Sequence, residues 1–151
     1  MLLYPDGNLF AVGRIPCEIC PIPGDRSDTK RLLIPVQVGG ITTTAVVDTG
    51  GIYLILAPDI AIELHLNPDG AIGQDSVKIR GWEYSGNLYR VYLDIPAEEG
   101  ESLQQDVATL VPNATAEEWG ELPTYLGLTG CLEYLRFAVD PIACQFYFAS
   151  A

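Results

Sequence analysis

Two apolar runs that flank a pair of glycines constrain the fold more than any other feature of the chain. Leu32–Val38 and Ile41–Val47 are rich in Val, Ile, Leu and Thr, which favour strands, and Gly39-Gly40 permits a tight turn between them. This pattern predicts a β-hairpin. A third apolar run, Ile52–Leu56, follows it, and a predicted short helix, Pro58–Leu66, comes next with Pro in its first turn.

The rest of the chain adds short strands and few helical residues. Apolar and polar residues alternate with a period of two along Leu88–Ile95, as in a half-buried strand. Shorter runs predict further strands at Val77–Ile79, Val107–Val111, Phe137–Val139 and Gln145–Phe148. A helical turn is predicted at Ala116–Gly120 and a short helix at Leu132–Leu135. We therefore predict an all-β fold with one or two short helices, and 151 residues suit one domain.

The first 31 residues carry prolines and glycines at short intervals. This composition predicts an irregular N-terminal arm, residues 1–31, with at most one short strand near Leu9–Val12. Residues 32–151 would then form the folded domain. The sequence leaves three roles open for the arm, which are a pro-segment, a dimerisation strand and a flexible arm.

The chain is strongly acidic, with 20 Asp and Glu against 8 Lys and Arg and a net charge of −12. Such a chain repels phosphate backbones, so we expect no nucleic-acid partner. The charge otherwise indicates either solubility alone or a preference for basic or neutral peptides. No apolar run reaches the roughly 18 residues needed to cross a bilayer, and the N-terminus lacks a secretory signal pattern. We therefore expect a soluble cytoplasmic protein without a membrane partner.

Four cysteines raise the question of a metal or redox site. Cys17 and Cys20 have zinc-ligand spacing, but Cys131 and Cys144 are too far apart to form a matching second pair, and His65 is the single histidine. Zinc binding and a disulfide or redox role stay open as alternatives, and free thiols are the outcome that we expect. We predict no metal and no cofactor.

The run Val46-Val47-Asp48-Thr49-Gly50 places a carboxylate directly after a strand predicted to be buried. Gly50 lets the chain turn sharply and brings backbone N–H groups close to the carboxylate. Thr49 supplies a hydroxyl that can tie the loop to a neighbour. Asp-x-Gly at a strand end is also a common turn signal, so an unrelated small β-barrel in which Asp48 caps a turn is one alternative.

The order of elements around this run resembles the retropepsin-like aspartic peptidases. That family has two hydrophobic residues, then Asp, Thr or Ser, Gly, a small residue and a strand. Val46–Gly50 fits this pattern, and Gly51 takes the place where the family has Ala, Ser or Thr. Tyr125-Leu126-Gly127 is similar to the family's two hydrophobics and Gly beside the catalytic loop, and Gly130–Leu135 to its C-terminal helix. The resemblance covers roughly residues 32–148 and implies a small closed acid-protease-like β-barrel.

The resemblance implies an aspartic endopeptidase that acts on a peptide or protein substrate. Its chemistry needs two carboxylates about 3 Å apart that share one proton. The chain has one Asp-Thr-Gly, because Asp28-Thr29 lacks the Gly. Asp48 must therefore meet Asp48 of a second copy across the axis of a homodimer, with Thr49 bonding across the axis and Gly50 beside it. We expect Gln145–Phe148 or the N-terminal arm to add a shared sheet to that dimer.

The family also covers its cleft with a hairpin, for which Val77–Tyr89 is the candidate, with a turn at Gly81–Asn87. An aromatic pair on this hairpin would exclude water from the cleft. The predicted substrate contacts are Gly51, Trp82, Tyr84 and Gly86. An ordinary hairpin is the alternative here. For the whole chain, the alternative is a catalytically inactive retropepsin-like fold that serves as a peptide-binding or dimerisation module.

Overall fold

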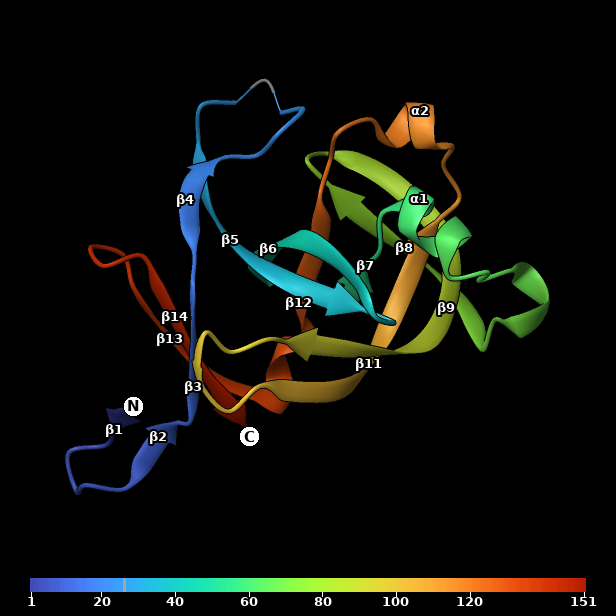
Figure 1. Cartoon of the computed structure of the whole chain (residues 1–151). Helices are drawn as coiled ribbons and strands as arrows, with labels where there is room; N and C mark the ends of the chain where they lie inside the picture. Colours follow the sequence, from blue (N-terminus) through green and yellow to red (C-terminus); the bar gives the residue numbers. More distant parts are fainter. Residues whose placement is uncertain (26) are drawn as a thin grey trace.

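The structure is a computed structural model, and it describes residues 1–25 and 27–151 (Figure 1). Strands hold 58% of the residues and helices 11%, which confirms the all-β prediction. No helix in the described part of the chain is long and apolar enough to span a membrane.

The chain consists mostly of strands joined by short connections. In chain order the strands are β1 (Leu2–Leu3), β2 (Leu9–Ala11), β3 (Gly13–Pro16), β4 (Glu18–Pro21), β5 (Lys30–Val38), β6 (Ile41–Ile52), β7 (Leu54–Ile55), β8 (Gly73–Ile79), β9 (Trp82–Ile95), β10 (Glu99–Gly100), β11 (Leu103–Pro112), β12 (Thr124–Thr129), β13 (Leu135–Asp140) and β14 (Gln145–Ser150). The helices are α1 (Pro58–Glu63) and α2 (Ala116–Trp119), with 3-10 turns η1 (Pro68–Gly70) and η2 (Leu132–Tyr134).

The main sheet has the strand order β4-β5-β6-β12-β7-β11-β9-β8, and β5 also pairs with β9. In that additional pair Val38 stands opposite Leu93, and the contact closes six strands into a ring. These strands supply most of the fully buried side chains, among them Ile34, Val36, Leu93, Leu110 and Leu126. Each buried aliphatic side chain stabilises the fold by roughly 1.5–3 kcal/mol, so the ring is its main source of stability.

A second sheet has the order β10-β3-β14-β13. Phe146 and Phe148 of β14 are fully buried, and Phe146 stacks on Phe137 with ring centroids 5.6 Å apart. Because β14 lies between β3 and β13, both of its edges are paired within the chain. Gln145–Phe148 therefore offers no free edge for the shared sheet that we predicted, and β10 and β13 are the outer strands.

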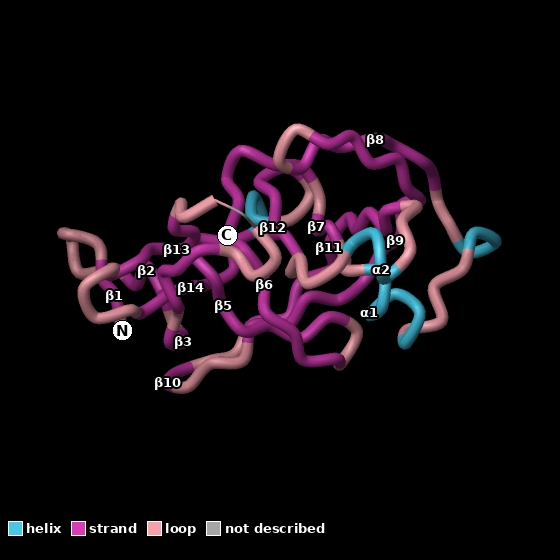
Figure 2. Tube along the Cα trace, turned by 90° about the horizontal axis from the view of Figure 1, so that it is seen from above, coloured by secondary structure: helices cyan, strands magenta, loops and turns pink. Residues whose placement is uncertain are grey.

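The N-terminal segment departs from the sequence prediction. It holds four strands, so the expected irregular arm with at most one strand is wrong. β3 pairs with β14 and β4 pairs with β5, which ties the segment to both sheets. Pro16 and Pro21 end their strands, where a missing N–H costs little. The boundary at residue 32 stays a prediction. Figures 1 and 2 place the β1–β2 hairpin at one end of the molecule and the helices α1 and α2 at the other.

The local turn predictions had mixed outcomes. Gly39 and Gly40 form the predicted turn, with left-handed φ angles of 56° and 87° that glycine tolerates. α1 starts at Pro58 as expected but ends at Glu63. The helix predicted at Leu132–Leu135 is only the 3-10 turn η2.

Candidate active site

Asp48 is positioned by three strands that meet around one glycine. β12 lies between β6 and β7, parallel to the first and antiparallel to the second, and Gly127 of β12 stands opposite Asp48. The connection from β6 to β7 passes close to β12. The N–H of Gly127 donates to the carbonyl oxygen of Tyr53 at 2.8 Å, and the N–H of Tyr53 donates to the carbonyl oxygen of Thr129 at 2.7 Å. A Cβ on Gly127 would lie 2.6 Å from the carbonyl oxygen of Tyr53, so only glycine fits there.

The carboxylate of Asp48 is half-buried and has different surroundings at its two oxygens. Oδ1 accepts a hydrogen bond from the N–H of Gly50 at 3.2 Å. On the other side, a Cβ added to Gly51 would lie 3.0 Å from Oδ2, so the missing side chain leaves that oxygen open. Thr49 is exposed beside them. The catalytic role of Asp48, Thr49 and Gly50 stays a prediction.

Two cavities adjoin Asp48. One, of about 280 Å³, is lined by residues that include Asp48, Gly51, Ile55, Val77, Ile79 and Tyr125. The other, of about 320 Å³, is lined by residues that include Arg31, Asp48, Thr49, Ile79, Arg80 and Tyr125. Both therefore lie between the Asp48 segment and the end of the β8–β9 hairpin, which is the arrangement that a covering flap needs.

The hairpin has a tighter turn than the sequence indicated. Arg80 and Gly81 alone form it, with φ angles of 55° and 83°, and Ile79 stands opposite Trp82. The predicted wide turn at Gly81–Asn87 is therefore wrong, because most of that segment belongs to β9. The two-residue turn is the connection that matches the twist of paired strands.

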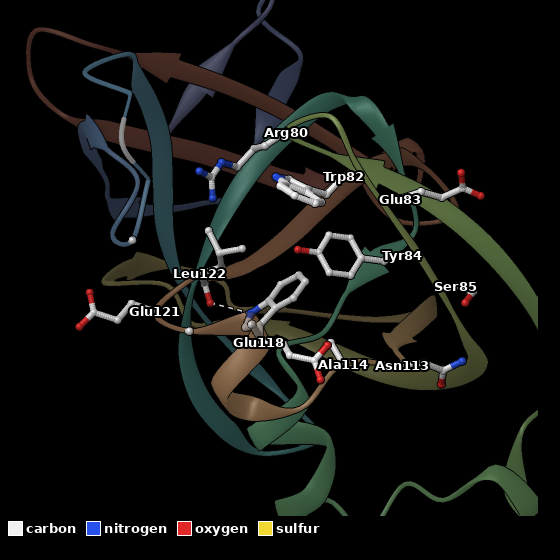
Figure 3. A pocket seen from close by; sticks show the side chains of 13 residues that line it. Arg80, Trp82, Glu83, Tyr84, Ser85, Asn113, Ala114, Glu118, Glu121 and Leu122 are labelled. Carbon is white, nitrogen blue, oxygen red and sulfur yellow. Dashed lines mark hydrogen bonds between the residues drawn. The ribbon is translucent and has the colours of Figure 1, made fainter.

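Trp82 and Tyr84 do not line the Asp48 cavities. They point into a separate cavity of about 740 Å³, whereas Glu83 turns the other way (Figure 3). The ring of Tyr84 meets that of Trp119 edge-on at 5.4 Å, and Trp119 meets Tyr125 at 6.4 Å. Tyr84 is thus joined to the Asp48 region through two rings.

Gly86 has a structural role in the strand. It is buried in β9, and a Cβ there would lie 2.2 Å from the carbonyl oxygen of Val111. Glycine at this position lets β9 approach β11 closely, and Gly86 lines none of these three cavities.

Sequence reasoning missed three side chains near the site. The hydroxyl of Tyr125 is buried without a hydrogen-bond partner among the described residues, and burial raises its pKa to about 12. The hydroxyl of Tyr53 donates to Oδ2 of Asp75 at 2.6 Å, which lowers the pKa of that carboxyl and ties the segment after Asp48 to β8. Both tyrosines lie in apolar runs of the sequence, which indicate packing in the core. Only their hydroxyl groups indicate a further role.

The four cysteines are unpaired in the described structure, and Cys17 and Cys131 are buried. Burial raises the pKa of the Cys131 thiol to about 12. No cluster of three or more His, Cys, Asp or Glu side chains able to hold a metal occurs among the described residues.

Comparison with known proteins gives a structural match. No protein-family model matches the chain. No curated protein matches its sequence either. The structure is similar to the crystal structure of a retropepsin-like aspartic protease from Rickettsia conorii, with a TM-score of 0.57 and 19% sequence identity. The match covers 93% of this chain and 95% of that one, which shows that the chain has a retropepsin-like fold.

Proposed function

We propose that the chain is an aspartic endopeptidase that hydrolyses peptide bonds as a homodimer. The observation that carries this proposal is the setting of Asp48. Its carboxylate is held at one oxygen by the N–H of Gly50, is open at the other, and borders two cavities under a β-hairpin. The retropepsin-like fold supports the same conclusion.

One Asp48 per chain is not sufficient for this chemistry. A two-fold axis would bring a second, identical carboxylate to the first, and two carboxylates about 3 Å apart hold one proton between them. The ionised carboxylate takes a proton from a water molecule, whose oxygen attacks the peptide carbonyl. The protonated carboxylate gives its proton to the carbonyl oxygen. The first carboxyl then passes the proton that it took from water to the amine nitrogen, the C–N bond breaks, and the intermediate's hydroxyl returns its proton to the second carboxylate as the carbonyl of the new acid forms.

The surrounding residues fit supporting roles. Thr49 is exposed next to Asp48, where its hydroxyl can bond across the axis. The β8–β9 hairpin places Val77 and Ile79 over the Asp48 cavity, and apolar side chains there exclude bulk water from the reaction.

A peptide-binding or dimerisation module without hydrolysis is the second candidate function. Gly51 is the observation that favours it, because no side chain at this position restrains Oδ2 of Asp48. A loosely held carboxylate would meet its symmetry mate less often in the reactive arrangement.

Cleavage of an unstructured protein at mildly acid pH tests the proposal. We expect the wild type to cleave it and Asp48→Asn to be inactive. Asp28→Asn is the matched control, because it makes the same chemical change in an exposed Asp-Thr pair and should stay active. Cleavage by Asp48→Asn at the wild-type rate would refute the mechanism. A wild type that binds peptides without cleaving them would support the second candidate.

A further inference from the structure

Basic side chains gather around Asp48, although the chain as a whole is acidic. Among the described residues, three of the chain's eight Lys and Arg line the 320 Å³ cavity, namely Arg31, Lys78 and Arg80, and Asp48 is the one acidic side chain in that lining. They come from β5, β8 and the hairpin turn. Basic side chains are therefore concentrated at the candidate active site, although the chain as a whole carries −12.

The three cations are not equally available to a ligand. Arg80 donates to Oδ1 of Asp25 at 2.8 Å, so its charge is already engaged. Lys78 stands opposite Glu83 in the β8–β9 pair, and a carboxylate on the same strand face reduces its effect.

Arg31 is the cation that stays available. It is exposed and forms no ion pair with any described residue, although the chain has 20 acidic side chains. It shares one face of β5 with Leu33, and Leu33 pairs with Val46, which shares a face of β6 with Asp48. Arg31 thus lies on the face of the sheet that carries Asp48.

Tyr125 also lines this cavity, and its buried hydroxyl is a second unused group. The side chain is 5% exposed, and its oxygen has no hydrogen-bond partner in the described structure. Burial raises its pKa to about 12, so the group keeps its proton and can donate. A buried donor without an acceptor costs free energy, and a ligand with an acceptor oxygen would remove that cost.

We infer that the cavity lined by Arg31 and Tyr125 accepts an acidic side chain, Asp or Glu, of the peptide substrate next to the bond that is cleaved. A carboxylate has two acceptor oxygens, which suit the planar guanidinium of Arg31 and the hydroxyl of Tyr125 together. The inference rests on the proposed endopeptidase function. It is the reverse of the preference for basic or neutral peptides that the net charge alone indicated.

The cations have a competing role, which is to stabilise the ionised form of Asp48 without contacting the substrate. The two roles differ in their consequences. A cation that acts on Asp48 changes the pH dependence of cleavage for every substrate alike. A cation that binds the substrate side chain changes KM for acidic peptides and leaves neutral peptides unaffected.

The test begins with a map of cleavage sites in a library of peptides from a digested proteome, where we expect Asp or Glu beside the cleaved bond. Matched peptides with Glu or Gln at that position then give kcat/KM, and we expect roughly a tenfold preference for Glu. Arg31→Gln should remove most of that preference through KM. Lys30→Gln removes the same charge from the adjacent position of β5, outside the cavity, and should leave the preference unchanged.

Tyr125→Phe separates recognition from folding. The hydroxyl makes no hydrogen bond in the described structure, so its removal should leave the thermal unfolding temperature unchanged or raised while the preference for Glu falls. Sedimentation of Arg31→Gln should show the same oligomeric state as the wild type. Dissociation of this variant, or an equal shift in its pH profile for both peptides, would overturn the inference.

Failure of the proposed function is distinguishable from failure of the inference. If the wild type cleaves no peptide, calorimetric binding of the Glu and Gln peptides to the wild-type protein decides the question. Tighter binding of the Glu peptide that is lost in Arg31→Gln supports the inference. Equal binding, or cleavage with equal kcat/KM, refutes it.

Discussion

Gly127→Ala should separate the Asp48 segment from its supporting strand β12. The added Cβ would lie 2.6 Å from the carbonyl carbon of Ile52 and 2.6 Å from the carbonyl oxygen of Tyr53, and backbone atoms cannot rotate away as a side chain can. Overpacking of this kind costs about 1–3 kcal/mol, and loss of the 2.8 Å bond from the Gly127 N–H adds about 0.5–1.5 kcal/mol. We therefore expect a loss of about 2–4 kcal/mol in the free energy of unfolding.

Urea unfolding and a thermal scan measure this loss. For a chain of this size the expected fall in the unfolding temperature is roughly 4–16 °C. Gly70→Ala is the control, because a Cβ added there would have no heavy atom within 4 Å and the φ of Gly70 is not left-handed, so we expect wild-type stability or a small gain. Because Gly127 stands opposite Asp48, peptidase activity should fall with stability in Gly127→Ala. A variant as stable as Gly70→Ala would refute the packing argument.

Three further predictions follow from the site and its surroundings. Cleavage should show a bell-shaped pH dependence on the acid side of neutral, as a shared proton requires, and Asp48→Asn should lower kcat by more than about a hundredfold while sedimentation shows an intact dimer. Tyr53→Phe removes the hydrogen bond that lowers the pKa of Asp75, so the variant should be less stable than the wild type at neutral pH. This difference in stability should vanish as the pH falls below 3.8, because the hydrogen bond stabilises the folded protein through the ionised form of the carboxyl. In the native protein Cys20 should react with a thiol reagent before Cys131, whose burial raises its pKa to about 12, and mass spectrometry of the labelled chain would show equal labelling if this is wrong.

The parts of the fold that sequence could predict are those fixed by neighbouring residues. The β5–β6 hairpin needs only two apolar runs and the left-handed glycines between them, and Asp48 follows directly on the second strand's apolar run. The N-terminal strands depend instead on remote partners. Arg14 of β3 stands opposite Tyr147, and no local pattern in a segment rich in Pro and Gly indicates that pairing.

The hairpin turn shows how tertiary contacts override a local signal. Gly86 and the following Asn87 have the composition of a turn, which led to the prediction of a wide loop. In the structure Gly86 is required because β11 approaches β9 there, within 2.2 Å of the position of a Cβ. The turn moves to Arg80-Gly81, and this shift places Arg80 rather than the aromatic pair beside Asp48.

The charge at the site could not be predicted from composition, because net charge is a sum over the whole chain whereas recognition depends on position. Arg31 and Tyr125 are far apart in the sequence, and they share a cavity only because β5, β6 and β12 are neighbours in one sheet. The same placement bears on the proposed dimer. Two copies that each carry −12 repel one another. Arg31, the cation on the face that carries Asp48, offsets part of the negative charge at the place where the two carboxylates have to meet.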